Sequence, residues 1–170
     1  MTPKSLLRHK RAVSTSNEFV IGSSFHRLLL DDAETSRGRT VSLAEDASIR
    51  RLVLCSGKIY YDLFEEREKL GLTDVYLLRV EQLYPFPLKS LVPILSRFKQ
   101  AEIVWCQEEP KNMGAWHFAG PYLEWVLAQA GCKSKRPVYA GRAASAATAT
   151  GMMSKHLTEL KAIMSEVFAA

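Results

Sequence analysis

The stretch Trp105-Cys106-Gln107-Glu108-Glu109-Pro110-Lys111-Asn112-Met113-Gly114-Ala115-Trp116 decides the fold of this chain. It joins a short apolar run, residues 103–106, to a second apolar run that begins at Ala115, through polar residues, proline and glycine. This order predicts a strand, a loop and a helix. In an α/β sheet such a loop lies outside the strand end, where the N-terminus of the following helix offers free N–H donors.

Two adjacent carboxylates, Glu108 and Glu109, lie in this loop beside Gln107. A solvated turn or an interface salt bridge accounts for them, and a packed domain junction is the more specific alternative. A role as general acid or base would require that one carboxylate raise the pKa of the other. Nothing in the sequence indicates this, so we treat both as interface candidates.

The rest of the chain alternates strands with helices. This order predicts right-handed βαβ units and an α/β fold with a mainly parallel, mixed sheet of about five strands, flanked by helices. We expect residues 1–48 to form a helical and loop lead-in, and residues 49–170 to form the α/β domain. The expected strands are 25–30 at an edge, 49–55, 74–80, 103–106 and 136–140; the expected helices are 2–11, 59–70, 88–98, 115–129 with an interruption near Pro121, and one from Met153.

Composition and spacing exclude several classes of protein. With 170 residues, 47% of them hydrophobic, the chain suits one core. Cys55, Cys106 and Cys132 form no CxxC pair, and the histidines lack metal-ligand spacing, so we expect neither a disulfide framework nor a metal site. No apolar run approaches the ~20 residues of a membrane span.

The net charge of +5 is concentrated at the N-terminus, where Lys4, Arg8, Lys10 and Arg11 precede the first acid, Glu18. Such an arm suits an anionic cofactor, nucleic acid or an acidic partner surface. Because it lacks interleaved aromatic residues or a recognition motif, we do not expect nucleic acid as the partner.

Three further features suggest binding or contact, each beside a plainer explanation. The run 56–58, Ser-Gly-Lys, lies where a phosphate could bind, but a structural turn explains it better and it is no Walker A loop. Trp105 and Trp116 are of a type enriched at interfaces, although core packing also uses tryptophan. Arg142 begins a small-residue loop up to Gly151 that suits either close approach of another chain or a linker. We find no catalytic constellation and no dinucleotide fingerprint, and assign no catalytic or cofactor-binding residue.

Five blocks of sequence, in collinear order over nearly all of the chain, carry a family resemblance. The chain resembles the C-terminal domain of the 2-oxoglutarate dehydrogenase E1 component, with the bacterial form closest, and more loosely the transketolase C-terminal domain. The fold implied is three-layered. The blocks are Met1–His9 (MTPKSLLRH), Leu54–Leu63 (LCSGKIYYDL), Arg79–Pro87 (RVEQLYPFP), Trp105–Trp116 (WCQEEPKNMGAW) and Tyr139–Arg142 (YAGR).

The resemblance implies a thiamin diphosphate and Mg²⁺ enzyme that decarboxylates 2-oxoglutarate and passes the succinyl group to the lipoyl arm of E2, in a complex that also contains E3. The cofactor and the catalytic residues belong to preceding domains, so we expect this chain, as a fragment or truncated reading frame, to be inactive alone. Its implied roles are packing on those domains and on the second subunit of a homodimer. We expect a cytoplasmic location in bacteria, or the mitochondrial matrix in a eukaryote.

Some family members bind acetyl-CoA or a nucleotide effector, which makes Lys4, Ser5, Arg8 and Lys58 candidate anion-binding residues. One loop departs from the pattern: Ala143 and Ala147-Thr148 stand where we expect Gly-Arg-Pro and Ser-Pro. The alternative to an E1 domain is a free-standing regulatory module that binds an anionic nucleotide or acyl-CoA.

Overall fold

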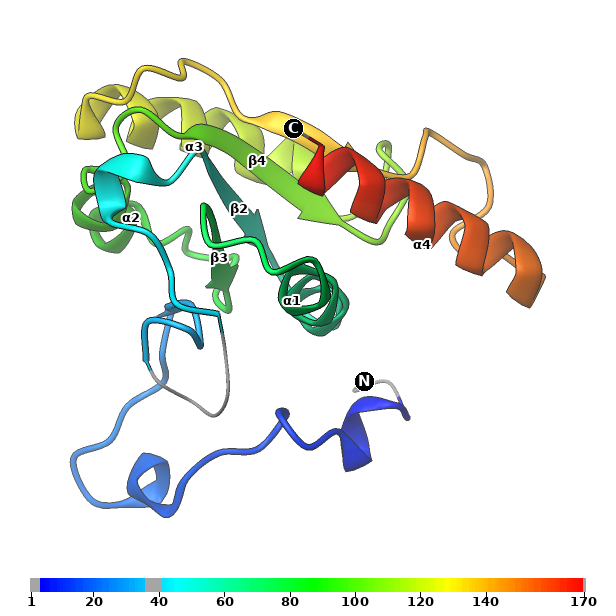
Figure 1. The fold of residues 1–170 in the computed structure, drawn as a ribbon, viewed down its shortest axis with the longest axis horizontal. Coiled ribbons are helices and arrows are strands. Elements are labelled where there is room, and N and C mark those ends of the chain that lie inside the picture. Colours follow the sequence, from blue (N-terminus) through cyan, green and yellow to red (C-terminus); the bar gives the residue numbers. More distant parts are fainter. Residues whose placement is uncertain (1–3, 36–40, 170) are drawn as a thin grey trace.

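The computed structural model describes residues 4–35 and 41–169, which form one five-stranded sheet covered by helices (Figure 1). The strand order is β1-β3-β2-β4-β5, with β1 antiparallel to β3 and all other neighbours parallel. This confirms the predicted mixed, mainly parallel α/β fold. The elements are η1 (Leu6–Arg8), η2 (Ser16–Phe19), β1 (Leu28–Leu29), η3 (Asp46–Ser48), β2 (Arg51–Cys55), α1 (Ile59–Leu70), β3 (Val75–Val80), α2 (Leu88–Leu95), β4 (Glu102–Gln107), α3 (Trp116–Ala130), β5 (Val138–Gly141) and α4 (Met153–Phe168).

The helices lie in two layers, one on each face of the sheet. Alternate residues of β2, β3 and β4 point to opposite faces, as the pleat requires. Leu54 and Trp105 pack with α2 and α3 in one core cluster, whereas Val53 and Val104 pack with α1 and α4 in the other. Burial on both faces explains why the strands read as continuous apolar runs.

Most predicted elements are confirmed, but α3 is not interrupted at Pro121. The helix runs from Trp116 to Ala130 without a break. Proline removes one helical hydrogen bond, to the carbonyl of His117. Both Pro121 and His117 are exposed, so that carbonyl can bond to water while the opposite face stays packed on the sheet. The N-terminal helix is shorter than predicted, with one 3-10 turn at Leu6–Arg8, and its predicted start at residues 2 and 3 lies outside the described residues.

A buried ion pair between Asp31 and Arg67 completes the sheet edge at β3. The short strand β1 pairs only with Val80 and Arg79 of β3. Farther along β3, the Asp31 carboxylate accepts the N–H of Leu77 (2.7 Å) and both terminal nitrogens of Arg67, and Arg67 also donates to the carbonyl of Val75 (3.2 Å). Both charged side chains are fully buried. The segment expected as lead-in thus contributes an edge strand and a core carboxylate to the α/β domain.

All three cysteines are free and buried. Burial raises the pKa of the Cys55 thiol to about 12 and also raises the pKa of Cys106 and of Cys132. Their thiolates are therefore scarce near neutral pH. In the described part of the chain, no helix has the length and apolar character that a membrane crossing requires.

We predict that Arg67→Met lowers the free energy of unfolding by about 3–5 kcal/mol, because it leaves the Asp31 carboxylate buried without its counter-charge. Urea unfolding followed by circular dichroism measures the change. Lys69→Met is the matched control: Lys69 lies on the same helix, is mostly exposed and pairs with Glu66, and its loss should cost at most about 1 kcal/mol. Equal effects of the two substitutions would show that the buried pair has no special role.

Candidate functional site at the carboxyl edge of the sheet

The parallel strands bring four loops to one edge of the sheet, because their carboxyl ends all point the same way. These loops are 56–58 after β2, 81–87 after β3, 108–115 after β4 and 142–152 after β5. β2 and β4 are neighbours, yet the helices that follow them, α1 and α3, cover opposite faces. The crevice between β2 and β4 is thus the topological switch point, where open α/β sheets bind their ligands.

The side-chain amide of Gln107 holds the loop after β4. Its Oε1 accepts the indole N–H of Trp105 and the backbone N–H of Trp116, both at 3.0 Å. Its Nε2 donates to the carbonyls of Met113 (2.7 Å) and Pro110 (3.2 Å). With 4% exposure, Gln107 fixes both ends of the loop from inside it.

Two glycines permit the close packing around Gln107. Gly114 has φ +66°, and a Cβ there would lie 2.8 Å from Gln107 Nε2. A Cβ on Gly141 would lie 2.8 Å from the Gln107 carbonyl and 2.5 Å from Tyr139 Oη. Tyr139 donates its hydroxyl to the Arg142 carbonyl (2.8 Å), and burial raises the pKa of Tyr139 to about 12, which keeps this donor protonated. The loops after β4 and β5 therefore fit together closely.

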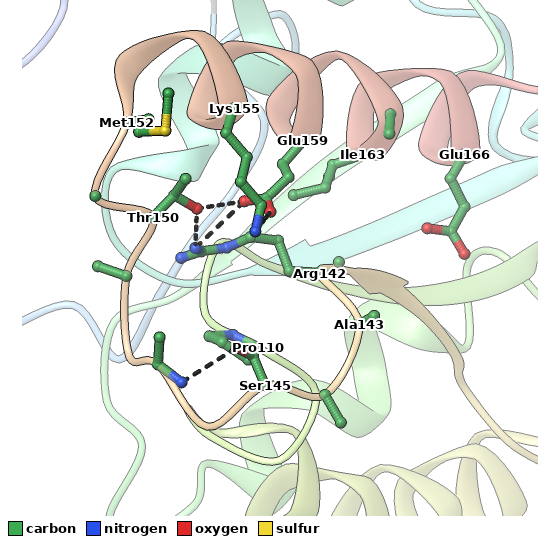
Figure 2. Close-up of a pocket in the computed structure, with 16 residues that line it drawn as sticks. Pro110, Arg142, Ala143, Ser145, Thr150, Met152, Lys155, Glu159, Ile163 and Glu166 are labelled. Atoms are coloured by element: carbon green, nitrogen blue, oxygen red, sulfur yellow. Dashed lines mark hydrogen bonds and ion pairs between the residues drawn. The ribbon is translucent and has the colours of Figure 1, made fainter.

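Arg142 ties three segments together. Its Nε donates to the Glu108 carbonyl (2.5 Å), which joins the loops after β5 and β4. Its Nη1 donates to Thr150 Oγ1 (3.0 Å) and lies 3.5 Å from the Glu159 carboxylate on α4. Figure 2 shows Arg142 lying beneath α4, with dashed lines that join it to Thr150 and Glu159. The loop 142–152 is thereby held to the helix that follows it.

This loop and α4 enclose a pocket of about 550 Å³ (Figure 2). Its lining is mostly small and apolar, with Arg142, Lys155, Glu159 and Glu166 as the charged groups. The Thr150 hydroxyl donates to Glu159 Oε2 (2.5 Å) and is the main cause of a lowered pKa of Glu159; Lys155 and Arg142 act in the same direction. Because this charge is balanced among neighbours, the pocket shows no clear preference for an anion or a cation.

A second pocket, of about 430 Å³, lies at the switch point. It is formed by residues from β4, α3 and three of the four loops. They are Ser56, Gly57, Leu83, Trp105, Gln107, Glu109, Gly114, Ala115 and Phe118. Three of the five sequence blocks that carry the family resemblance thus contribute to the wall of one cavity.

Comparisons with known proteins show the family of the chain. Residues 13–168 match the family model described as 2-oxoglutarate dehydrogenase C-terminal. The chain belongs to this family. The 2-oxoglutarate dehydrogenase E1 component of Brucella anthropi is 67% identical over 166 residues, which are 98% of this chain and 17% of the relative. That of Brucella ovis is 66% identical over 98% of this chain and 16% of the relative. The chain thus spans about one sixth of the length of these relatives.

In this member of the 2-oxoglutarate dehydrogenase C-terminal family, the interface candidates lie together at the carboxyl edge. Glu109 and Arg142 are at the surface or partly buried there, and Trp116 begins α3. Trp105 is only 1% exposed, so its side chain orients Gln107 within the core and does not reach the surface of the described chain. Lys58 lies 2.5 Å from Asp62 and 3.8 Å from Glu108, which neutralise its charge.

The other effector candidates, Lys4, Ser5 and Arg8, are exposed on the N-terminal arm. This arm rests on α1 through a contact between His9 Nε2 and a carboxylate oxygen of Glu65 (3.1 Å) and through Arg11, which lies over the ring of Phe64. These contacts lie at Phe64 and Glu65, more than one helical turn beyond Lys58, whose partners among the described residues are Asp62 and Glu108. Among the residues described, no cluster of His, Cys, Asp and Glu could hold a metal ion. The described residues therefore offer no ligand set for a Mg²⁺ ion.

Sequence reasoning missed several residues of this edge and of the adjoining core. In the sequence Gln107 stands out only as a neighbour of two glutamates, although its side chain organises the loop. Thr150 and Glu159 gave no local signal because their contact joins a loop to a helix. Asp31 had one signal, since it follows an apolar run directly, but only the fold shows that Arg67 faces it.

We predict that Gly114→Ala destabilises the chain by at least about 1 kcal/mol more than Gly131→Ala. Both glycines have nearly the same positive φ, so both substitutions carry the same backbone cost. Only at position 114 does the new methyl group meet Gln107; position 131 is open. Urea unfolding of the two variants measures the difference. Equal losses would mean that the Gln107 contact does not constrain the loop.

We predict that Thr150→Val raises the pKa of Glu159 toward its ordinary value of 4.5, because the hydroxyl stabilises the charged carboxylate. A lowered pKa means that this interaction is present above pH 4.5 and is lost as the pH falls through the lower value. Titration of the Glu159 carboxyl carbon by ¹³C NMR measures both pKa values. Thr158→Val is the control, since that hydroxyl donates to the Ser154 carbonyl on the same helix. The same shift in both variants would contradict the assignment.

Proposed function

We propose that this chain acts as the C-terminal domain of a 2-oxoglutarate dehydrogenase E1 component. One observation carries the proposal: 67% identity to the Brucella anthropi E1 component over 98% of the chain, with only one sixth of that relative covered. At this level of identity the same fold and the same packing surfaces are expected. The remaining five sixths of such an enzyme would supply the cofactor site and the catalytic residues.

The activity of the assembled enzyme would be oxidative decarboxylation of 2-oxoglutarate and transfer of the succinyl group to the lipoyl group of E2. Thiamin diphosphate and Mg²⁺ would supply the chemistry from the other domains. The part of this chain is structural: the carboxyl edge, with Glu108, Glu109, Trp116 and Arg142, would pack against those domains or the second subunit of a homodimer. E2 and E3 would be the further partners in the complex, in the bacterial cytoplasm.

The N-terminal segment has two proposed roles. Residues 1–48 would lead in from the preceding E1 domain, with residues 28–32 already joined to the sheet. Lys4, Ser5 and Arg8 would face an anionic effector at that junction, with Lys58 joining them only if its carboxylate neighbours were displaced. The exposed side chains of Phe19 and Ile21 support burial of this segment against another domain.

We predict that the purified chain shows no 2-oxoglutarate-dependent reduction of an artificial electron acceptor with thiamin diphosphate and Mg²⁺. Mixing it with the part of the Brucella anthropi E1 component that precedes the matched region should give activity. The full Brucella enzyme is the positive control, and the mixture without this chain is the negative control. Activity of the chain alone, or silence of the mixture while the full enzyme works, would contradict the proposal.

A further inference from the structure

The cavity at the switch point is lined by both polar and aromatic residues. Ser56 and Glu109 are among its polar lining residues. Neither makes a hydrogen bond or ion pair through its side chain with another described residue. Leu83, Trp105 and Phe118 also line the cavity. A ligand that fills it therefore meets hydrogen-bond acceptors together with apolar and aromatic residues.

The charge around the cavity is negative. Lys58 is the nearby cation, but Asp62 and Glu108 both lie within 4 Å of its ammonium group. Lys111 lies over the ring of Tyr139, and Arg142 donates to Thr150. Both cations therefore contact residues that do not line this cavity. Among the described residues, no cationic side chain lies within 4 Å of the Glu109 carboxylate. A cation is favoured here, and an anion such as a phosphate is opposed although two helices begin nearby.

An exposed aromatic shelf continues from the cavity. The ring of Phe118, which lines the cavity, lies 5.1 Å from the ring of Tyr122 and 6.5 Å from that of Tyr84. Tyr84 is 80% exposed, and Trp125, one turn beyond Tyr122 on α3, is 48% exposed. Aromatic faces attract cations, and their area accepts apolar side chains next to one.

We propose that this cavity binds the guanidinium group of an arginine, presented by a polypeptide segment outside this chain with apolar residues beside the arginine. Glu109 and the Ser56 hydroxyl receive the guanidinium donors, Phe118 packs on its planar face, and the shelf formed by Tyr84, Tyr122 and Trp125 takes the apolar neighbours. A planar cation with several donors matches this combination, which a compact ammonium group fits less well. The source of the segment rests on the proposed function, since the other E1 domains or the second subunit would supply it.

Two short peptides test the site on the chain alone, whether or not E1 activity can be restored. The probes are acetyl-Leu-Arg-Leu-amide and acetyl-Leu-Glu-Leu-amide, and binding is followed by ¹H–¹⁵N NMR of the labelled chain. We expect the arginine peptide to shift the amide signals of Gly57, Gly114 and Phe118 at millimolar concentration, and the glutamate peptide to leave them in place. Acetyl-arginine-amide should bind at least about threefold more weakly than the arginine peptide, because it lacks the apolar neighbours.

Matched variants connect this binding to the named residues. Glu109→Gln should weaken binding of the arginine peptide about tenfold. The control is Glu124→Gln, which removes a carboxylate on α3 that pairs with Arg136 and does not line the cavity. It should change the affinity less than about twofold. Both replacements are close in shape, so circular dichroism should show unchanged folding. Equal binding of both tripeptides, no shift of the cavity amides, or equal effects of the two variants would overturn the proposal. If acetyl-arginine-amide bound as tightly as the arginine peptide, the claim that a polypeptide segment presents the arginine would be overturned.

Discussion

Backbone hydrogen bonding between β2 and β4 is the constraint on which the rest of the molecule depends. The two strands are paired in parallel over five residues, from Arg51 with Glu102 to Cys55 with Cys106. They are distant in sequence, because α1, β3 and α2 lie between them. Their pairing places β3 and β5 on either side, buries both faces of the sheet and creates the switch point. Together with the pairing of β4 and β5, that alignment brings the loops of the carboxyl edge together.

A pair of charged side chains satisfies backbone groups at the β3 edge of the sheet, whereas a neutral amide side chain does so at the carboxyl edge. At the β3 edge, a carboxylate and a guanidinium compensate each other and satisfy backbone groups that a longer β1 would otherwise pair. At the carboxyl edge, the neutral amide of Gln107 satisfies groups from the core and from the loop at once. Such a fully satisfied amide fixes a loop without burying a charge. The charges of Glu108, Glu109 and Arg142 are then available at the surface or in ion pairs.

The sequence predicted most of the fold but only part of the site. Apolar runs that alternate with helical periodicity gave the strands and helices, since burial on both faces leaves a strong local pattern. The predicted interruption of α3 at Pro121 was wrong. Proline removes one helical hydrogen bond, but the carbonyl of His117 can bond to water and the opposite face of α3 stays packed on the sheet. The sequence predicts each loop of the carboxyl edge separately. Their meeting through Gln107, and the contact of Thr150 with Glu159, depend on tertiary geometry that no local pattern encodes.

The proposed structural role would use the loops of the carboxyl edge, which Gln107 and Arg142 hold together, as a packing surface. Hydrogen–deuterium exchange of this chain, alone and with the preceding part of the Brucella anthropi E1 component, tests this account most directly. The account predicts new protection in residues 56–58, 82–87, 108–118 and 141–152, with little change in α2. Protection confined to α2, or none at these loops, would contradict it.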